Sequence, residues 1–176
     1  LNLSQGKLGE DTAALMGAMF ITKLQLTAMN RVHLPEDKRP DFYLYVDEFQ
    51  NFATTSFVKI LSEARKYRLN LMLANQYIGQ VEEDIQKAIF GNVGTLSTFV
   101  VGARDAELLQ KEFGGKFEAD DLVTLGKFEI LLKMAIDGLT SRPFMGLTLP
   151  LPNVRNENRD KIINVCLERY YRKVNV

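Results

Sequence analysis

The stretch Phe42-Tyr43-Leu44-Tyr45-Val46-Asp47-Glu48 is the part of the sequence that decides the fold. Its first five residues form an unbroken run of apolar and aromatic β-formers, which is typical of a parallel strand whose two faces are both covered by helices. Two acidic residues then end the run. Because ligands in open α/β sheets bind beyond the carboxyl ends of the strands, Asp47 and Glu48 are the first candidates for a functional site.

Two segments downstream repeat the pattern of an apolar strand that ends in polar residues. Residues 69–74 lead into Asn75 and Gln76, and residues 95–101 lead into residues 102–105. Apolar residues at helical spacing follow each strand. Strands that alternate with helices predict a parallel, doubly wound sheet, and we expect the three strand ends to converge at one edge of it.

The pattern changes toward the C-terminus. Residues 128–136 and 139–149 flank Asp137-Gly138, a signal for a type I′ turn, so an antiparallel hairpin is predicted to close one edge of the sheet. We expect a core of residues 1–152 and a C-terminal helical segment of residues 153–176 packed on it. The apolar residues of that last helix are Ile162, Ile163, Cys166, Leu167, Tyr170 and Val174. Asn156 or Asn158 is expected to cap its N-terminus.

Residues 11–31, on the N-terminal side, show the periodicity of a helix. Further apolar residues widen its main stripe, so this helix is expected to be covered on two sides. Residues 32–41 are rich in charge and proline and predict an exposed loop. The stripe consists of Leu15, Ala18, Met19, Leu26 and Met29.

Composition narrows the classes of function. Of 176 residues, 46% are hydrophobic and 25% charged, as in one globular domain, and 22 basic residues balance 22 acidic ones. A charged partner must therefore meet a local patch rather than a global field. One cysteine and one histidine exclude an intramolecular disulfide and any metal site built from several such ligands, and they fit a reducing, cytosolic setting.

The N-terminal residues and the hydropathy of the sequence indicate whether the chain has a membrane span, a signal peptide or a missing N-terminal part. No apolar run approaches the roughly 18 to 20 residues of a membrane span, and the first residues lack the features of a signal peptide. The chain begins with Leu1 rather than with methionine, which indicates a fragment.

An apolar strand that ends in Asp-Glu is the Walker B arrangement. Asp47 would help to hold Mg²⁺, and Glu48 would orient and polarise a water near the γ-phosphate. Gln76, at the end of a neighbouring strand, can hydrogen-bond a phosphate oxygen or that water without adding charge. The alternatives are that Asp47 and Glu48 only end a strand and that Gln76 only caps the next helix.

Longer stretches around these residues carry a family resemblance. Residues 43–52 (YLYVDEFQNF), residues 63–67 (EARKY) and the run into Gln76 resemble the TraG/TraD-like coupling proteins of conjugation and type IV secretion, within the HerA/FtsK superfamily of ring ATPases. The likeness continues through residues 90–95 and 142–150, so it covers most of the chain.

The resemblance implies a fold, a function and cofactors. The fold would be α/β, a three-layer RecA-like P-loop ATPase fold with a mostly parallel sheet. The function would be that of a hexameric motor that uses ATP and Mg²⁺ to move DNA or nucleoprotein, with other type IV secretion components as partners. Such a motor would lie in the cytoplasm, at the inner face of the cell membrane.

The resemblance also implies a role for each candidate residue. Asp47 would be the Walker B metal residue, Glu48 the catalytic glutamate, Gln76 the sensor glutamine and Arg65 an arginine finger. The finger of the family precedes the sensor glutamine by eleven residues, as Arg65 precedes Gln76 here. An arginine that reaches a neighbour's γ-phosphate stabilises charge in phosphoryl transfer. Without the resemblance, Arg65 would be interpreted as a solvated cation at a helix C-terminus.

The sequence departs from that of a complete ATPase, because G-x-x-x-x-G-K-[ST] occurs nowhere in it. Without this phosphate-cradling loop the chain lacks the main grip on a triphosphate. The family places the loop upstream, so we expect the C-terminal half of a motor domain, with the RecA-like fold partial on its N-terminal side. The isolated chain is expected to be inactive as an ATPase, and any membrane anchor is expected in regions absent from it.

Two other functions compete with the motor. A degenerate nucleotide-binding fold would serve only as a non-catalytic interaction or assembly module. A Mg²⁺-dependent nuclease would use Asp41, Asp47 and Glu48, but the sequence lacks a Glu-x-Lys at the expected place after the strand.

The remaining polar residues carry weaker signals. Lys59, Lys66 and Arg68 could face DNA, but Glu63 lies among them, so a solvated helix face is preferred. His33 is predicted to be solvent-exposed, and Cys166 is predicted to be a core residue rather than a nucleophile.

Overall fold

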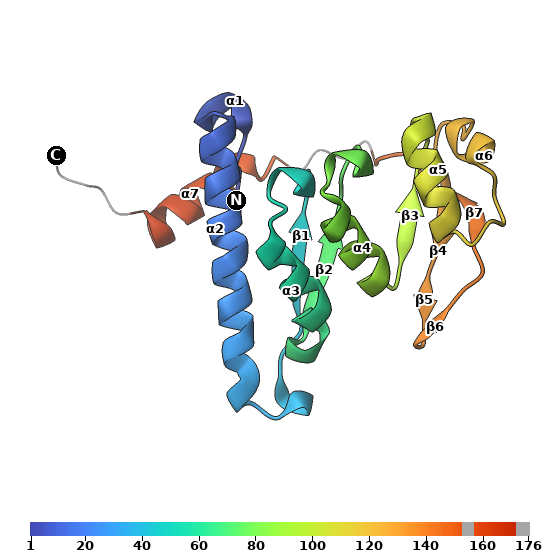
Figure 1. The fold of residues 1–176 in the computed structure, drawn as a ribbon. Helices are drawn as coiled ribbons and strands as arrows, with labels where there is room; N and C mark the ends of the chain where they lie inside the picture. Colours follow the sequence, from blue (N-terminus) through green and yellow to red (C-terminus); the bar gives the residue numbers. More distant parts are fainter. Residues whose placement is uncertain (153–156, 172–176) are drawn as a thin grey trace.

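Two parallel strands form the centre of the structure, which is a computed structural model that describes residues 1–152 and 157–171 (Figure 1). Strand β1 (Phe42–Val46) pairs with β2 (Leu69–Leu73), from Phe42 opposite Leu69 to Val46 opposite Leu73. Both strands lie where the apolar runs predicted them, and their carboxyl ends lie at the same edge.

Helices flank these strands along the chain. The α-helices are α1 (Gln5–Leu8), α2 (Glu10–Met29), α3 (Thr55–Glu63), α4 (Glu83–Asn92), α5 (Ala103–Glu112), α6 (Ala119–Val123) and α7 (Arg159–Tyr170). Short 3-10 turns connect them: η1 (Asn30–His33), η2 (Glu36–Lys38), η3 (Phe49–Asn51), η4 (Ala64–Tyr67) and η5 (Ile78–Gln80). His33, at the end of η1, is exposed as predicted.

A second sheet is antiparallel. Strand β4 (Glu129–Lys133) lies between β3 (Leu96–Thr98) and β7 (Phe144–Leu147). The chain turns between β5 (Ala135–Ile136) and β6 (Leu139–Thr140), where Asp137 and Gly138 have φ angles of 49° and 80°, as a type I′ turn requires. The predicted hairpin is confirmed, and β7 closes this edge.

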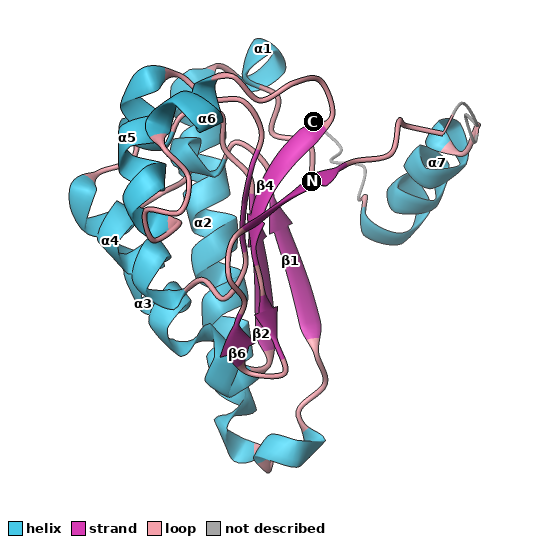
Figure 2. Cartoon of the chain, turned by 90° about the vertical axis from the view of Figure 1, so that its right-hand side faces the viewer, coloured by secondary structure: helices cyan, strands magenta, loops and turns pink. Residues whose placement is uncertain are grey.

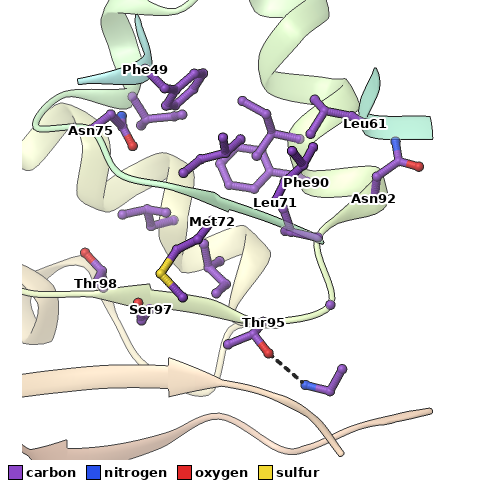
Figure 3. Close-up of a pocket in the computed structure, with 18 of the residues that line it drawn as sticks. Phe49, Leu61, Leu71, Met72, Asn75, Phe90, Asn92, Thr95, Ser97 and Thr98 are labelled. Carbon is purple, nitrogen blue, oxygen red and sulfur yellow. Dashed lines mark hydrogen bonds between the residues drawn. The ribbon is translucent and has the colours of Figure 1, made fainter. Parts of the chain in front are cut away.

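Strands β5 and β6 form a third, two-stranded sheet, and no hydrogen bonds between strands join the three sheets in the described residues. Between β2 and β3 lies a cavity of about 710 Å³, which Figure 3 shows from close by. The single, mostly parallel sheet of the sequence analysis is therefore not formed by these elements alone, and the RecA-like fold stays a prediction.

Helices α2 to α6 lie on one face of the strands (Figure 2). On that face Phe57, Ile60 and Ile85 are buried in the main core, and a second core around Phe113 and Leu122 lies under α5 and α6. On the opposite face Tyr43 and Tyr45 are 61% and 65% exposed. The expectation that helices cover both faces of β1 is thus not met within the described part of the chain.

Helix α2 buries a different side from the one predicted. Ala13, Gly17, Ile21 and Ala28 are buried, whereas Leu15, Met19 and Leu26 of the predicted stripe are exposed. The expectation of cover on two sides is not met within the described residues. The small side chains of Ala13, Gly17 and Ala28 allow this side of the helix to approach the core closely.

The helix from Glu10 to His33 is also long and apolar enough, by length and composition, to cross a membrane, with a hydropathy of 1.2. The expectation that no segment approaches a span is therefore wrong by this criterion. A helix packed on a core passes the same test, and α2 packs against α3 and η4.

Helix α7 has no buried residue. Cys166 is exposed, so its interpretation as a core residue is wrong. Asn158 occupies the N-cap position, whereas Asn156 and Val174, which were predicted as cap and helix residue, lie outside the described residues. The predicted domain boundary adjoins residues 153–156, which also lie outside them.

Candidate functional site

Two of the three predicted strand ends meet directly, and the third contacts the loop that follows Gln76. Gln76 Nε2 donates a hydrogen bond of 2.7 Å to Glu48 Oε1 and so joins the ends of β1 and β2. The buried Asp105 carboxylate accepts hydrogen bonds of 3.0 and 3.1 Å from the amides of Ile78 and Gly79, just after Gln76. The predicted convergence is therefore confirmed for the ends of β1 and β2, whereas Asp105, on the third segment, holds the loop that follows Gln76 and does not contact Glu48 or Gln76 through a hydrogen bond in the described residues.

Glu48 lies in the left-handed region, with φ 50° and ψ 44°. A residue with a Cβ there costs about 1 to 2 kcal/mol, and such strain concentrates at functional sites. Backbone bonds hold the turn in place: Ala74 N donates to Val46 O, and Phe49 N donates to Ala74 O at 3.0 Å. The turn aims the Glu48 side chain across the end of β2.

Gln50 is a residue of this site that the sequence analysis missed. Its Nε2 donates to Glu48 Oε2, so amides of Gln50 and Gln76 each hold one oxygen of the same carboxylate. Each carboxylate oxygen retains a second lone pair for a water or a ligand. Gln50 Oε1 is buried and has no hydrogen-bond partner among the described residues.

Asp47 is exposed beside this group. Its Oδ1 accepts a hydrogen bond of 3.0 Å from the Glu48 amide. No group of three or more His, Cys, Asp or Glu side chains able to hold a metal occurs in the described residues. One free carboxylate nevertheless suits Mg²⁺, which proteins bind through one or two carboxylates plus waters and phosphate oxygens.

A hollow of about 850 Å³ lies over these side chains. Asp47, Glu48, Gln50 and Gln76 line one side of it, and residues 1–6 line another. Its volume lies in the range of small-molecule sites in proteins.

Arg65 lies away from this group. It is exposed on η4, which precedes β2, whereas Gln76 follows β2. Five strand residues at about 3.3 Å each separate the two ends by roughly 16 Å. The chain therefore brings Asp47, Glu48 and Gln76 together but does not bring Arg65 to them.

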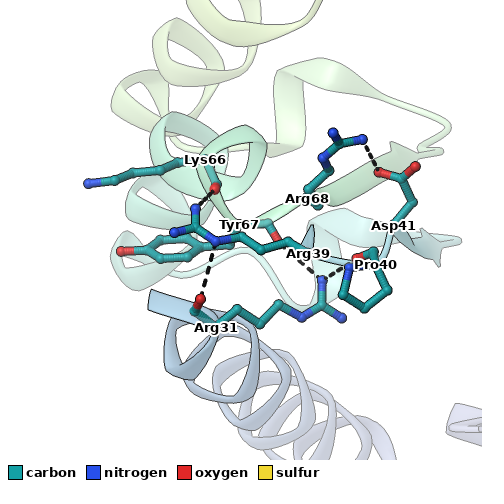
Figure 4. A network of polar contacts seen from close by, with 7 residues as sticks. All are labelled: Arg31, Arg39, Pro40, Asp41, Lys66, Tyr67 and Arg68. Atoms are coloured by element: carbon teal, nitrogen blue, oxygen red, sulfur yellow. Dashed lines mark hydrogen bonds and ion pairs between the residues drawn. The ribbon is translucent and has the colours of Figure 1, made fainter. Parts of the chain in front are cut away.

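Arginine side chains fix the turn that carries Arg65 (Figure 4). Arg31 Nη1 donates to Tyr67 O at 3.0 Å and to Pro40 O at 2.8 Å. Arg39 donates to Lys66 O and, through Nε, to the carbonyls of Arg31 and Leu34. Carbonyls at helix ends lack partners within the helix, so these cations satisfy them and position η4.

The residues proposed for a nuclease are not brought together. Asp41 precedes β1 and pairs with Arg68 at 3.4 Å, at the end of the strand opposite to Asp47 and Glu48. Lys59, Lys66 and Arg68 are all exposed, as expected for a solvated face.

One region of the chain is similar to a known protein family. A search of curated proteins finds no match. Residues 41–116, less than half of the chain, match the family model described as the TraM recognition site of TraD and TraG. That region spans β1 to α5 and includes Asp47, Glu48, Arg65 and Gln76. This part of the chain is therefore TraG/TraD-like.

Proposed function

We propose that the chain is the C-terminal part of an ATP-driven DNA or nucleoprotein translocase motor of the TraG/TraD-like coupling-protein type. The hydrogen bond of 2.7 Å from Gln76 to Glu48, beside Asp47 at the ends of adjacent parallel strands, is the observation that carries the proposal. In this proposal the motor is a hexameric ring at the inner face of the cell membrane.

Each residue has a distinct role in the proposed reaction. Mg²⁺-bound ATP supplies the phosphoryl group that water attacks. Asp47 would hold Mg²⁺ through a carboxylate oxygen, Glu48 would accept a hydrogen bond from the water, and Gln76 would fix the Glu48 carboxylate and sense the bound nucleotide. Arg65 stabilises charge at the site of a neighbouring subunit, because it is too far from its own Glu48.

The test uses the longer protein, since these 176 residues contain no G-x-x-x-x-G-K-[ST] to grip a triphosphate. Glu48→Gln keeps the size of the side chain and one acceptor oxygen for Gln76 or Gln50, but it replaces the other oxygen by a donor and removes the base. We expect turnover to fall by about 10² to 10⁴ with ATP affinity nearly unchanged. Phosphate release and nucleotide titration measure the two quantities.

Glu36→Gln, in η2 at the opposite end of the molecule, is the matched control and should leave both quantities unchanged. Normal turnover in Glu48→Gln would remove Glu48 from the reaction.

The matched family model supports a second candidate function, recognition of a TraM-type partner. The matched region of this chain carries exposed aromatic side chains, Tyr43 and Tyr45, on the sheet face that no helix of the described residues covers. Exposed aromatic groups of this kind are enriched in protein interfaces. Calorimetric titration of the chain with TraM from a conjugative system tests this function, and absence of heat at micromolar concentrations would contradict it.

A further inference from the structure

Asp105 is a buried carboxylate to which the proposed reaction gives no role. It lies in the first turn of α5 and is 6% exposed. Burial of a carboxylate is costly unless hydrogen bonds replace the lost water. The amides of Ile78 and Gly79 donate to its two oxygens, and the N-terminus of α5 adds a favourable dipole. Both oxygens therefore bind one short piece of backbone.

The piece of backbone that Asp105 binds begins two residues after Gln76. Two residues before Gln76, backbone hydrogen bonds of 2.9 and 3.0 Å fix Ala74 to the end of β1 and to the turn after it. The segment from Ala74 to Ile78 is thus held at both ends, with Gln76 in its middle. A displacement of Gln76 by about 1 Å would lengthen its bond of 2.7 Å to Glu48 beyond the usual range of a hydrogen bond.

Gly79 allows the loop to approach the carboxylate closely. A Cβ on this residue would lie 3.1 Å from Asp105 Oδ1, which is tighter than an ordinary contact. Gln86 Nε2, on α4, donates to the carbonyls of Ile78 and Val81 at 3.1 and 2.6 Å. Because these bonds hold the η5 turn itself, we expect replacement of Asp105 to move the turn rather than to unfold it.

Asp105 also connects two parts of the structure that no strand ladder joins in the described residues. Leu109 of α5 is buried in one core with Leu131 of β4, whereas Ile78 of η5 is buried in the core of β1 and β2. A shift of α5 would therefore reach the segment that carries Gln76 through the Asp105 carboxylate.

We propose that Asp105 is a positioning residue for Gln76: it ties the segment that carries Gln76 to α5, so that the Gln76 amide reaches Glu48. Asp105 acts through the backbone of residues 76–79. Its effect on ATP turnover rests on the proposed function, whereas its effect on the Gln76 side chain does not.

The first test uses the 176-residue chain and needs no nucleotide. Asp105→Asn leaves one acceptor oxygen and turns a donor toward the other loop amide. The NH₂ resonances of Gln76 are assigned by their loss in Gln76→Ala. In Asp105→Asn we expect them to move toward those of a solvent-exposed glutamine, and their protons to exchange with water about tenfold faster or more. Glu107→Gln, an exposed position in the same helix with the same change of charge, is the matched control and should leave them unchanged.

Unchanged Gln76 resonances and exchange in Asp105→Asn would overturn the proposal. Changes spread evenly over both cores would contradict it as well, because they would show general support of the fold rather than positioning of Gln76. If Asp105→Asn does not fold, Asp105→Ser, a smaller side chain with an acceptor oxygen, decides by the same criterion.

The second test measures turnover in the longer protein. Asp105→Asn should lower kcat by about 10²-fold with the KM for ATP nearly unchanged, since a misplacement of about 1 Å can cost this much. In a Gln76→Ala background the same substitution should lower kcat by less than about threefold, because Asp105 acts through Gln76.

Equal losses in the two backgrounds would show that Asp105 does not act through Gln76. Absence of turnover in the unmodified longer protein would instead refute the proposed ATPase, and the resonances of Gln76 would still decide the role of Asp105.

Discussion

Glu48 combines backbone strain with a carboxylate that two amides hold. A glycine in its place would adopt the same φ at no steric cost, yet it would leave Gln50 and Gln76 without an acceptor. The strain is therefore best explained by what the side chain does at this position, which is to present a fixed carboxylate next to Asp47.

Two substitutions separate the strain from the carboxylate. Both Glu48→Asn and Glu48→Val remove the carboxylate. Asparagine tolerates the left-handed region, whereas the β-branched side chain of valine does not. We expect Glu48→Asn to unfold in urea within about 1 kcal/mol of the original chain and Glu48→Val to be less stable than Glu48→Asn by about 1 to 2 kcal/mol. Equal stabilities of the two variants would show that residue 48 does not hold the left-handed conformation in solution.

The site residues differ in how far the sequence predicts them. Asp47, Glu48 and Gln76 could be predicted because each follows an apolar run. Gln50 could not, since it meets Glu48 only through a left-handed turn, which leaves no periodic signal. Asp105 was predicted by position alone, and its bonds to Ile78 and Gly79 depend on where a distant loop lies.

Among the elements, α2 sets the position of the turn that follows Glu48. Phe52, one residue beyond η3, lies against Gly17, where a Cβ would come within 2.1 Å of the ring. The sequence did not predict this contact. Apolar residues of α2 occur on all sides of the helix, so their periodicity does not show which side is buried. The strands and the hairpin were predicted better, since a continuous apolar run and Asp137-Gly138 specify local geometry.

A pair of glycine substitutions tests this contact. Alanine favours a helix over glycine by about 1 kcal/mol, but overpacking costs about 1 to 3 kcal/mol. We expect Gly17→Ala to lower the free energy of unfolding by up to about 2 kcal/mol. Gly91→Ala, in α4 with nothing within 4 Å of the added methyl group, should raise it by up to about 1 kcal/mol. Urea denaturation measures both, and a stabilised Gly17→Ala variant would mean that Phe52 does not pack there.

At the scale of the whole molecule, the candidate residues occupy two opposite ends. Asp47, Glu48 and Gln76 lie at the carboxyl ends of β1 and β2, and Arg65 lies before β2 on a turn fixed by Arg31 and Arg39. Each end of one chain therefore carries only some of the candidate catalytic residues. Under the proposed ring, the arginine end of one subunit would complete the acidic end of the next.

Mixed rings of the longer protein test that arrangement. Arg65→Ala alone should lower turnover by about 10³ or more with nucleotide binding preserved, and Glu48→Gln alone should also be nearly inactive. In a mixture of the two, some interfaces pair an intact Glu48 with an intact Arg65 of the neighbour. We expect the mixture to regain turnover above that of either variant, measured by phosphate release across mixing ratios. Normal turnover of Arg65→Ala by itself would show that the eleven-residue spacing to Gln76 is coincidental and that Arg65 is a solvated cation.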